Sequence, residues 1–215
     1  MEKIGIFGGT FDPIHIGHLR TCLEVKEEKG LDKAFFVPNN IPPHKNPAGA
    51  PPDVRYEMVK RALRNYPSFE VCDLEIKRGG RSYTIDTVRE FKEKFGRDKR
   101  YFFISGSDAF SSITTWKDYK NLLREVSFLV MYRSGHFYPF LEDILPEDIF
   151  SEFEIIERGR RYLNKKTGTS VEFVNVTLIE VSSTYIRNLV RKGKSITFLV
   201  PKEVEEYIKE RKLYT

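Results

Sequence analysis

The chain has 215 residues, of which 40% are hydrophobic and 31% are charged, and its formal net charge is +5. This length and composition predict one globular domain of ordinary size, and they fit neither a disordered chain nor a coiled coil. Basic residues alternate with acidic ones, as in 24–29, so the modest positive excess favours an anionic small substrate over nucleic acid.

The sequence contains no candidate membrane segment. Its apolar stretches have the length of strands, and the first residues lead directly into one of them, unlike a signal peptide. Cys22 lies in a helical pattern and Cys72 in a strand-like run, so they form neither a C-x-x-C metal site nor a disulfide framework. We expect a cytoplasmic protein with no membrane and no nucleic acid among its partners, and a homo-oligomer is compatible with the sequence.

From residue 3 to residue 132, apolar runs typical of strands alternate with segments of helical periodicity. Ile85, Val88 and Phe91 form one helical face, and Gly30 and Gly96 lie where two helices are expected to end. This alternation predicts an α/β fold with a doubly wound, mostly parallel sheet, whose ligand binds at the carboxyl ends of the strands. The predicted strands are Lys3–Gly8, Lys33–Pro38, Phe69–Asp73, Tyr101–Ser105 and Val126–Tyr132.

The pattern becomes irregular in 134–170, where glycines, prolines and a basic cluster give no clear period. We interpret this segment as an insertion that contains a hairpin around 165–168. The chain is expected to form one structural domain overall. It consists of a core, 1–181, and a small C-terminal helical part, 182–215.

The first predicted strand ends in a glycine pair, Gly8 and Gly9, and a helical pattern follows closely. Glycines allow the backbone to approach an anion, and the N–H groups at a helix start favour negative charge. His15 and His18 are three residues apart, so at a helix start they lie on one face and can contact the same phosphate group. Singly, a glycine pair is usually a turn and a histidine usually a structural residue. Together they predict a phosphate site, although the block matches neither the dinucleotide fingerprint nor the P-loop.

A zinc site is the alternative interpretation of the two histidines. The remaining histidines are His44 and His136, and the sequence has no H-E-x-x-H frame. No dedicated metal site is therefore predicted.

A second polar segment follows a predicted strand at Val171–Val181, and a last helix is predicted to begin at Pro201. Ser182 is expected to cap a short helix, and no Glu or Gln follows three residues later. The first-turn amides are therefore predicted to be free for phosphate oxygens. Arg187, one turn into the helix, presents a fork of donors that suits phosphate. An ordinary amphipathic helix with Ile186 on its core face is the alternative, and Arg187 lies off that face.

These two segments resemble the signature motifs of the nucleotidyltransferase superfamily. Residues 10–18, T-F-D-P-I-H-I-G-H, resemble its T/S-x-F-D-P-x-H-x-G-H motif with the spacer residue missing, and residues 181–187 resemble its I-S-S-T-x-I-R motif. The H-I-G-H tetrad also occurs in class I aminoacyl-tRNA synthetases, but the sequence has neither a K-M-S-K-S loop nor a tRNA-binding body. We therefore favour the smaller nucleotidyltransferases.

Three further segments resemble the bacterial nicotinate mononucleotide adenylyltransferases: 42–45 (P-P-H-K), 82–87 (S-Y-T-I-D-T), and 106–108 (G-S-D) followed by Trp116. The resemblance covers nearly the whole chain except 134–170. It implies transfer of AMP from ATP to nicotinate mononucleotide, giving nicotinate adenine dinucleotide and pyrophosphate, with Mg²⁺ bound with ATP. The alternatives are pantetheine-phosphate adenylyltransferase, nicotinamide mononucleotide adenylyltransferase, and a nucleotide-sensing or nucleic-acid-binding protein that has kept the fold without turnover.

The resemblance also implies a set of site residues. Catalytic roles fall to His15 and His18 at the transferring phosphoryl group and to Arg187 at the leaving pyrophosphate. Asp108 suits a ribose hydroxyl or a bound metal, although a helix N-cap is the simpler interpretation. The expected ATP contacts are Gly8, Gly9, Thr10, Phe11, His15, His18, Gly106, Asp108, Ser182, Ser183, Thr184 and Arg187. The expected mononucleotide contacts are His44, Lys45, Tyr83, Thr84, Ile85, Trp116, Lys117 and Arg133.

The chemistry of nicotinate mononucleotide agrees with these assignments. Trp116 and Tyr83 offer aromatic surfaces for the pyridine ring, although without the resemblance both would be interpreted as core residues. The resemblance places the nicotinate carboxylate near Thr84 and the adjoining backbone amides. His44 and Lys45 lie in a proline-rich loop that suits the mononucleotide phosphate.

Overall fold

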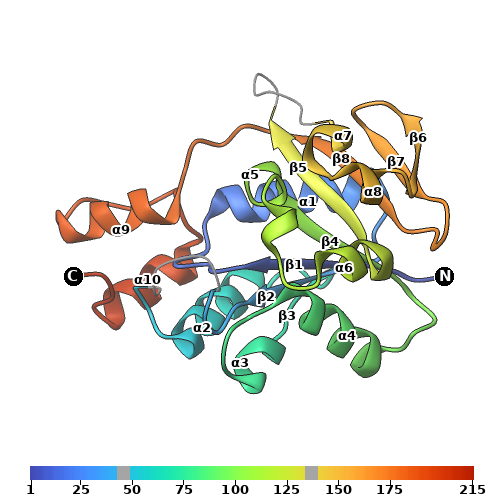
Figure 1. Ribbon diagram of the computed structural model, residues 1–215. Helices are drawn as coiled ribbons and strands as arrows, with labels where there is room; N and C mark the ends of the chain where they lie inside the picture. The colour runs from blue at the N-terminus through green and yellow to red at the C-terminus, as the bar shows by residue number, and fades with distance from the viewer. Residues whose placement is uncertain (43–48, 134–139) are drawn as a thin grey trace.

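The computed structural model describes residues 1–42, 49–133 and 140–215. The described strands form one sheet in the order β3-β2-β1-β4-β5-β8-β7-β6 (Figure 1). All neighbouring strands from β3 to β8 in this order are parallel, and the pairs β8-β7 and β7-β6 are antiparallel. The strands are β1 (Lys3–Gly9), β2 (Lys33–Pro38), β3 (Phe69–Val71), β4 (Arg100–Gly106), β5 (Ser127–Arg133), β6 (Phe153–Glu157), β7 (Arg161–Asn164) and β8 (Ser170–Val176).

Helices flank the sheet on both faces, which confirms the predicted doubly wound α/β class (Figure 1). Successive strand residues point to opposite faces, so Phe35 and Val37 of β2 join one core while Ala34 and Phe36 join the other. The helices are α1 (Ile16–Lys29), α2 (Pro52–Leu63), α3 (Leu74–Arg78), α4 (Thr84–Phe95), α5 (Ser107–Phe110), a 3₁₀ turn η1 (Ile113–Thr115), α6 (Tyr119–Glu125), α7 (Leu141–Ile144), α8 (Glu147–Phe150), α9 (Ser183–Arg191) and α10 (Lys202–Glu210).

The sheet order places a switch point beside β1. The chain leaves β1 for β2 and β3 on one side and later enters β4 on the other side of β1. Ligands of doubly wound folds bind at such a reversal, outside the carboxyl ends of the strands. Gly9 ends β1 and Gly106 ends β4, so the two predicted glycine segments flank this point.

The segment that was predicted to be irregular is regular in its described part. Residues 140–170 hold α7, α8, β6 and β7, and the hairpin predicted around 165–168 is confirmed as the turn between β7 and β8. The prediction of irregularity was wrong because β6 lies at the sheet edge. Only Phe153 of this strand is buried, so its sequence lacks the alternation that identifies a half-buried strand.

The two C-terminal helices begin where the sequence predicts them. α10 buries Val204, Tyr207 and Ile208 in the core that it shares with α2. α9 buries Ile186 alone and extends away from the sheet at the side of the molecule (Figure 1). The polar face of α9 therefore stays accessible near the carboxyl end of β1.

Both cysteines are buried and unlinked to each other. Burial raises the pKa of the Cys22 and Cys72 thiols, so both stay protonated near neutral pH. None of the described helices is both long and apolar enough to cross a bilayer.

Candidate active site

The loop after β1 closes around the side chain of Phe11. This ring is 2% exposed, and the residue adopts a φ of +48°. A Cβ atom on Gly9 would lie 2.7 Å from Cζ of the ring, so position 9 requires glycine for the loop to close. The Phe11 side chain thus belongs to the core, and only its backbone remains for the nucleotide contact predicted from the sequence.

The two histidines come together at the start of α1. His15 is the N-cap residue and His18 lies in the first turn. Their rings stack with centroids 3.6 Å apart, and His18 Nδ1 accepts a hydrogen bond from the His15 N–H at 3.3 Å. Phe11 meets the His18 ring edge-on, with centroids 5.1 Å apart. The pair shares one face as predicted, and its contact with a phosphate group stays a prediction.

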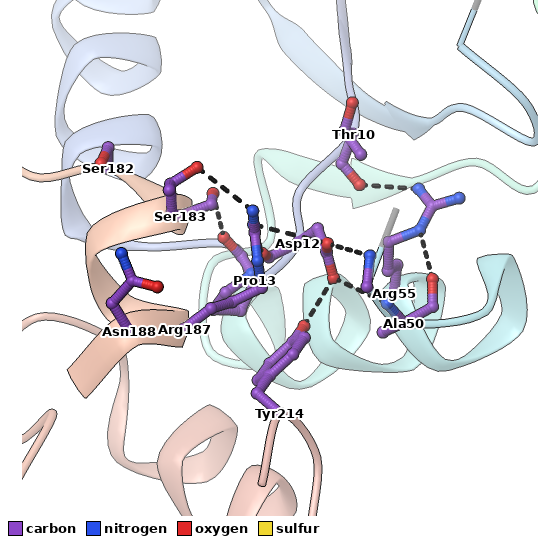
Figure 2. Close-up of polar contacts among 12 residues, drawn as sticks. Thr10, Asp12, Pro13, Ala50, Arg55, Ser182, Ser183, Arg187, Asn188 and Tyr214 are labelled. Carbon is purple, nitrogen blue, oxygen red and sulfur yellow. Dashed lines mark hydrogen bonds and ion pairs between the residues drawn. The ribbon is translucent and has the colours of Figure 1, made fainter. Parts of the chain in front are cut away.

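α9 is attached to this loop by its first turn (Figure 2). The Ser183 hydroxyl donates to the Pro13 carbonyl at 2.9 Å. Ser182 caps the helix, because its Oγ accepts a hydrogen bond from the Tyr185 N–H at 3.1 Å. The prediction that the first-turn amides are all free is therefore wrong for Tyr185, since a serine N-cap occupies one of them itself.

Arg187 reaches from α9 to the same loop (Figure 2). Its Nη1 donates to the Asp12 carbonyl oxygen at 2.7 Å and lies 3.5 Å from the Asp12 Oδ2. Its Nη2 donates to Thr184 Oγ1 at 3.2 Å, and the side chain is 20% exposed. The guanidinium therefore lies where the two predicted phosphate motifs meet and remains accessible to a ligand.

Arg55 anchors the loop after β1, and no sequence motif indicated its place in the site. It is 0% exposed, and its guanidinium donates to the carbonyl oxygens of Thr10 (2.7 Å), Asn39 (2.7 Å) and Ala50 (3.1 Å). These bonds tie the end of β1 to the end of β2 and to the start of α2. A signal was present in the sequence, because Arg55 lies on the same helical face as the buried Met58.

Asp12 is the second buried charge that sequence reasoning left unassigned. It is 3% exposed, and its carboxylate accepts hydrogen bonds from the N–H groups of Gly49 (2.6 Å) and Ala50 (3.1 Å). The Tyr214 hydroxyl donates to its Oδ1 at 2.7 Å (Figure 2). Asp12 stands within the first phosphate motif, but its contact with Tyr214 spans the length of the chain, so no local pattern could indicate it.

A pocket of about 380 Å³ opens at the carboxyl ends of β1 and β4. Volumes of this order are typical of small-molecule sites. Both predicted sets of contacts contribute to its wall: Gly8, Gly9, Thr10, Gly106 and Asp108 from the ATP set, and Tyr83, Thr84, Trp116 and Lys117 from the mononucleotide set. The structure thus brings together segments that are far apart in the sequence.

Aromatic rings form one wall of this pocket. Trp116 is half-buried and meets the ring of Phe103 edge-on, with centroids 6.1 Å apart. Lys117 Nζ lies 4.7 Å from the centroid of the Tyr83 ring and 2.9 Å from Asp86 Oδ2. The core and ligand interpretations of Trp116 are therefore compatible, because one side of the indole packs on the core while the residue also lines the pocket.

Glu75 also lines the pocket, although no sequence motif identifies it. Its side chain is buried, and Oε1 accepts a hydrogen bond from Thr87 Oγ1 at 2.5 Å. Burial raises the pKa of Glu75, and hydrogen bonds from Ser82 and Thr87 oppose that shift. A raised pKa reduces the negative charge that this residue places beside a ligand.

Among the predicted mononucleotide contacts whose side chains the structure describes, Ile85 does not line the pocket. The Ile85 side chain is 0% exposed in the core, so only its backbone remains for the predicted contact. His44 and Lys45 lie outside the described residues, as does the side chain of Arg133. The predicted roles of these three side chains stay predictions.

A dedicated metal centre is not found in residues 1–42, 49–133 and 140–215, where no three His, Cys, Asp or Glu side chains gather in a way that could hold an ion. Asp108 is an exposed carboxylate in the pocket wall. A divalent cation at this site would therefore take most of its oxygen ligands from a bound phosphate group and from water.

Comparisons with known proteins relate the chain to nucleotidyltransferases. It matches a family model described as cytidylyltransferase-like over residues 6–189. It is 44% identical over 213 residues to a protein of Geotalea uraniireducens named probable nicotinate-nucleotide adenylyltransferase, covering 99% of this chain and 98% of that protein. A protein of Pelobacter propionicus with the same name is 41% identical over 214 residues, again covering 99% and 98%.

Solved structures show the same fold. The Plasmodium falciparum nicotinic acid mononucleotide adenylyltransferase complexed with NaAD superposes with a TM-score of 0.70 at 20% identity, covering 100% of this chain and 98% of that chain. The structure of the same enzyme complexed with APC gives a TM-score of 0.71 at 19% identity over the same shares. The predicted fold class is thus confirmed by comparison as well as by topology.

Proposed function

Because this chain belongs to the nicotinate-nucleotide adenylyltransferase family, we propose that it transfers AMP from ATP to nicotinate mononucleotide and releases pyrophosphate. One observation carries this proposal. The pocket at the switch point is lined by the glycine segments of β1 and β4 and by Tyr83, Thr84 and Trp116, and it adjoins the loop that carries the histidine pair. A nucleotide site and an aromatic acid site therefore lie side by side.

The chemistry is an in-line attack of the mononucleotide 5′-phosphate on the α-phosphorus of ATP. The attacking phosphate is already ionised near neutral pH, so positioning and electrostatic stabilisation carry the catalysis without a strong general base. His15 and His18 stabilise charge on the transferring phosphoryl group. Arg187 and the first turn of α9, 182–184, hold the β- and γ-phosphates until pyrophosphate leaves.

Mg²⁺ is proposed to enter with ATP. The site fits such an ion because the exposed carboxylate of Asp108 lines the pocket and the triphosphate supplies further oxygen ligands. When bound, the ion shields the negative charge of the triphosphate. The remaining contacts to the phosphate groups come from His15, His18, Arg187 and residues 182–184.

Nicotinate recognition is proposed at the start of α4. Thr84 is the first residue of this helix, and its N-cap is Tyr83. Backbone N–H groups and the helix dipole at such a terminus favour a carboxylate. Trp116, which lines the same pocket, supplies the stacking surface for the pyridine ring.

We also propose that residues 182–215 complete the ATP site of a single domain whose core is 1–181. Two observations support this arrangement. Arg187 and Tyr214 both contact Asp12, and α10 packs on α2. A cytoplasmic location stays a prediction, and a homo-oligomer stays compatible with the sequence.

Pyrophosphate release from ATP tests the proposed function. The purified protein is incubated with ATP, Mg²⁺ and one of three acceptors: nicotinate mononucleotide, nicotinamide mononucleotide or phosphopantetheine. We expect release with the first acceptor, accompanied by nicotinate adenine dinucleotide on chromatography. Release with phosphopantetheine alone would assign the chain to the alternative enzyme, and ATP binding without release from any acceptor would indicate a nucleotide sensor.

A further inference from the structure

The segment after α10 brings Tyr214 to Asp12 in the loop between β1 and α1 (Figure 2). The Leu213 N–H donates to the Ile208 carbonyl at 3.0 Å, and both Lys212 and Tyr214 adopt left-handed φ angles, +50° and +63°. Such angles are uncommon for residues other than glycine, and here they bend the segment. The bend directs the Tyr214 hydroxyl to Asp12 Oδ1, at 2.7 Å.

Tyr214 completes a set of neutral donors around the Asp12 carboxylate. Oδ1 also accepts from the Ala50 N–H at 3.1 Å, and Oδ2 accepts from the Gly49 N–H at 2.6 Å. Asp12 is 3% exposed, so bulk water has little access to replace a missing donor. A buried carboxylate that loses one donor is strongly driven to find another.

Arg187 is the charged donor that stands nearest to this carboxylate in the described contacts. Its Nη1 lies 3.5 Å from Asp12 Oδ2 but donates to the Asp12 backbone carbonyl at 2.7 Å. The guanidinium is thus held mainly through a neutral oxygen. A bidentate pair with the carboxylate would be stronger, and it would occupy donors that a phosphate group requires.

We propose that Tyr214 is a positioning residue for adenylyl transfer: its hydroxyl keeps the Asp12 carboxylate from capturing Arg187, so that the guanidinium stays available to the triphosphate of ATP. This inference rests on the proposed function, in which Arg187 holds the phosphates. Burial raises the pKa of Tyr214, and the negative charge of Asp12 acts in the same direction. The hydroxyl is therefore a proton donor across the physiological pH range.

The substitution Tyr214→Phe removes the hydroxyl and keeps the ring. We expect the KM for ATP and the Kd of a non-hydrolysable ATP analogue, measured by calorimetry, to rise about tenfold or more, because the Asp12 carboxylate that loses this donor then competes with the triphosphate for Arg187. The KM for nicotinate mononucleotide should not change. Tyr207→Phe is the matched control, since this ring is buried in the same C-terminal part and its hydroxyl makes no hydrogen bond with any described residue.

A double variant tests whether the effect passes through Asp12. In Asp12→Asn the competing charge is absent, so adding Tyr214→Phe to Asp12→Asn should change the analogue Kd little, whereas the same substitution in the wild type changes it strongly. A merely structural role for Tyr214 would give equal losses in both backgrounds. Tyr214→Phe with a wild-type Kd, or with equal rises in both KM values and a lower Tm, would overturn the inference.

The two proposals fail separately. Absence of pyrophosphate release from the wild type with every acceptor would contradict the proposed function, and the Kd comparison would still decide the role of Tyr214. Normal turnover of the wild type together with an unchanged Kd in Tyr214→Phe would contradict only the positioning role.

Discussion

Two buried carboxylates in this molecule have similar exposure but different surroundings. Asp12, 3% exposed, is held by two backbone N–H groups, a tyrosine hydroxyl and a neighbouring arginine at the β1–α1 loop. Glu152, 6% exposed, accepts hydrogen bonds from the side chains of Arg124 (3.0 Å), Asn164 (3.2 Å) and Lys166 (3.3 Å). The first carboxylate borders the candidate active site, and the second joins α6 to the β6–β7 hairpin.

Burial of a carboxylate therefore does not by itself indicate an active site. Around Glu152 the cations are bound to the carboxylate itself, and the hydrogen bond from Arg124 lowers the pKa of Glu152 to about 2. Around Asp12 neutral donors bind the carboxylate, while Arg187 is held through a backbone carbonyl. What distinguishes the candidate site is a cation whose shorter contact is with a neutral carbonyl oxygen and not with the buried carboxylate.

The largest loss of turnover is expected from substitutions of the residues proposed to contact phosphate. His18→Ala and Arg187→Ala should each lower kcat by about 10²–10³, because each removes one preorganised contact to the transferring or leaving phosphates. Their Tm values should change by only a few degrees. Arg191→Ala, at an exposed position one turn further along α9, is the control and should leave kcat unchanged. Near-normal turnover in either active-site variant would remove that residue from the mechanism.

An intermediate effect is expected at the aromatic wall. Trp116→Ala should raise the KM for nicotinate mononucleotide roughly 5- to 150-fold, the range that corresponds to the loss of one stacking contact, and leave the KM for ATP nearly unchanged. Trp116→Phe, which keeps an aromatic surface, should lose much less. Because the indole also packs on Phe103, some loss of Tm is expected. Equal rises in both KM values would show that Trp116 is only a core residue.

The smallest effect on activity is expected at the other carboxylate. Glu152→Gln should leave kcat and both KM values unchanged and lower the free energy of unfolding by about 1–3 kcal/mol, since charged partners are left without their anion. For a chain of this size that corresponds to roughly 2–4 °C of Tm per kcal/mol. Glu154→Gln, at an exposed position on the same hairpin, is the control. A loss of turnover in Glu152→Gln without a loss of Tm would contradict the structural role assigned to Glu152.

Glu152 also determines part of the dependence of the free energy of unfolding on pH in the acidic range. The pKa of Glu152 lies well below its ordinary value, mainly because of the hydrogen bond from Arg124. Its stabilising contribution is therefore complete above the ordinary carboxyl range and is lost as the pH falls towards about 2. Denaturant unfolding between these limits should be less steeply pH-dependent in Glu152→Gln than in Glu154→Gln. Identical slopes would contradict the assigned shift.

Local patterns predicted those parts of the fold in which neighbouring residues alone determine the structure. The strand predicted at Lys3–Gly8 is found at Lys3–Gly9, and the helix after Ser182 begins where its cap predicts. Phe69–Asp73 was too long by two residues, because the chain leaves the sheet after Val71 to begin α3. The strand predicted at Val171–Val181 is found at Ser170–Val176, and its predicted extension corresponds to the link to α9.

The candidate site was predictable where a motif is contiguous and was missed where contacts join distant segments. The histidine pair and Arg187 stand in recognisable motifs, and the structure places them at one loop. Arg55 and Tyr214 reach that loop from α2 and from the segment after α10, so only the folded chain reveals them. Glu75 was missed because a single buried acid has no sequence signature.

The ratio of kcat/KM for nicotinate mononucleotide to that for nicotinamide mononucleotide, measured at saturating ATP, shows whether the pocket recognises the nicotinate carboxylate. In the proposed site the start of α4 aims donors at the nicotinate carboxylate, and a carboxamide would turn its NH₂ group towards one of them and leave that donor unpaired. An unpaired buried donor costs about 1–3 kcal/mol, so the acid should be preferred roughly tenfold or more. Equal or reversed efficiencies would contradict the assignment of Thr84 and the start of α4 to the nicotinate carboxylate.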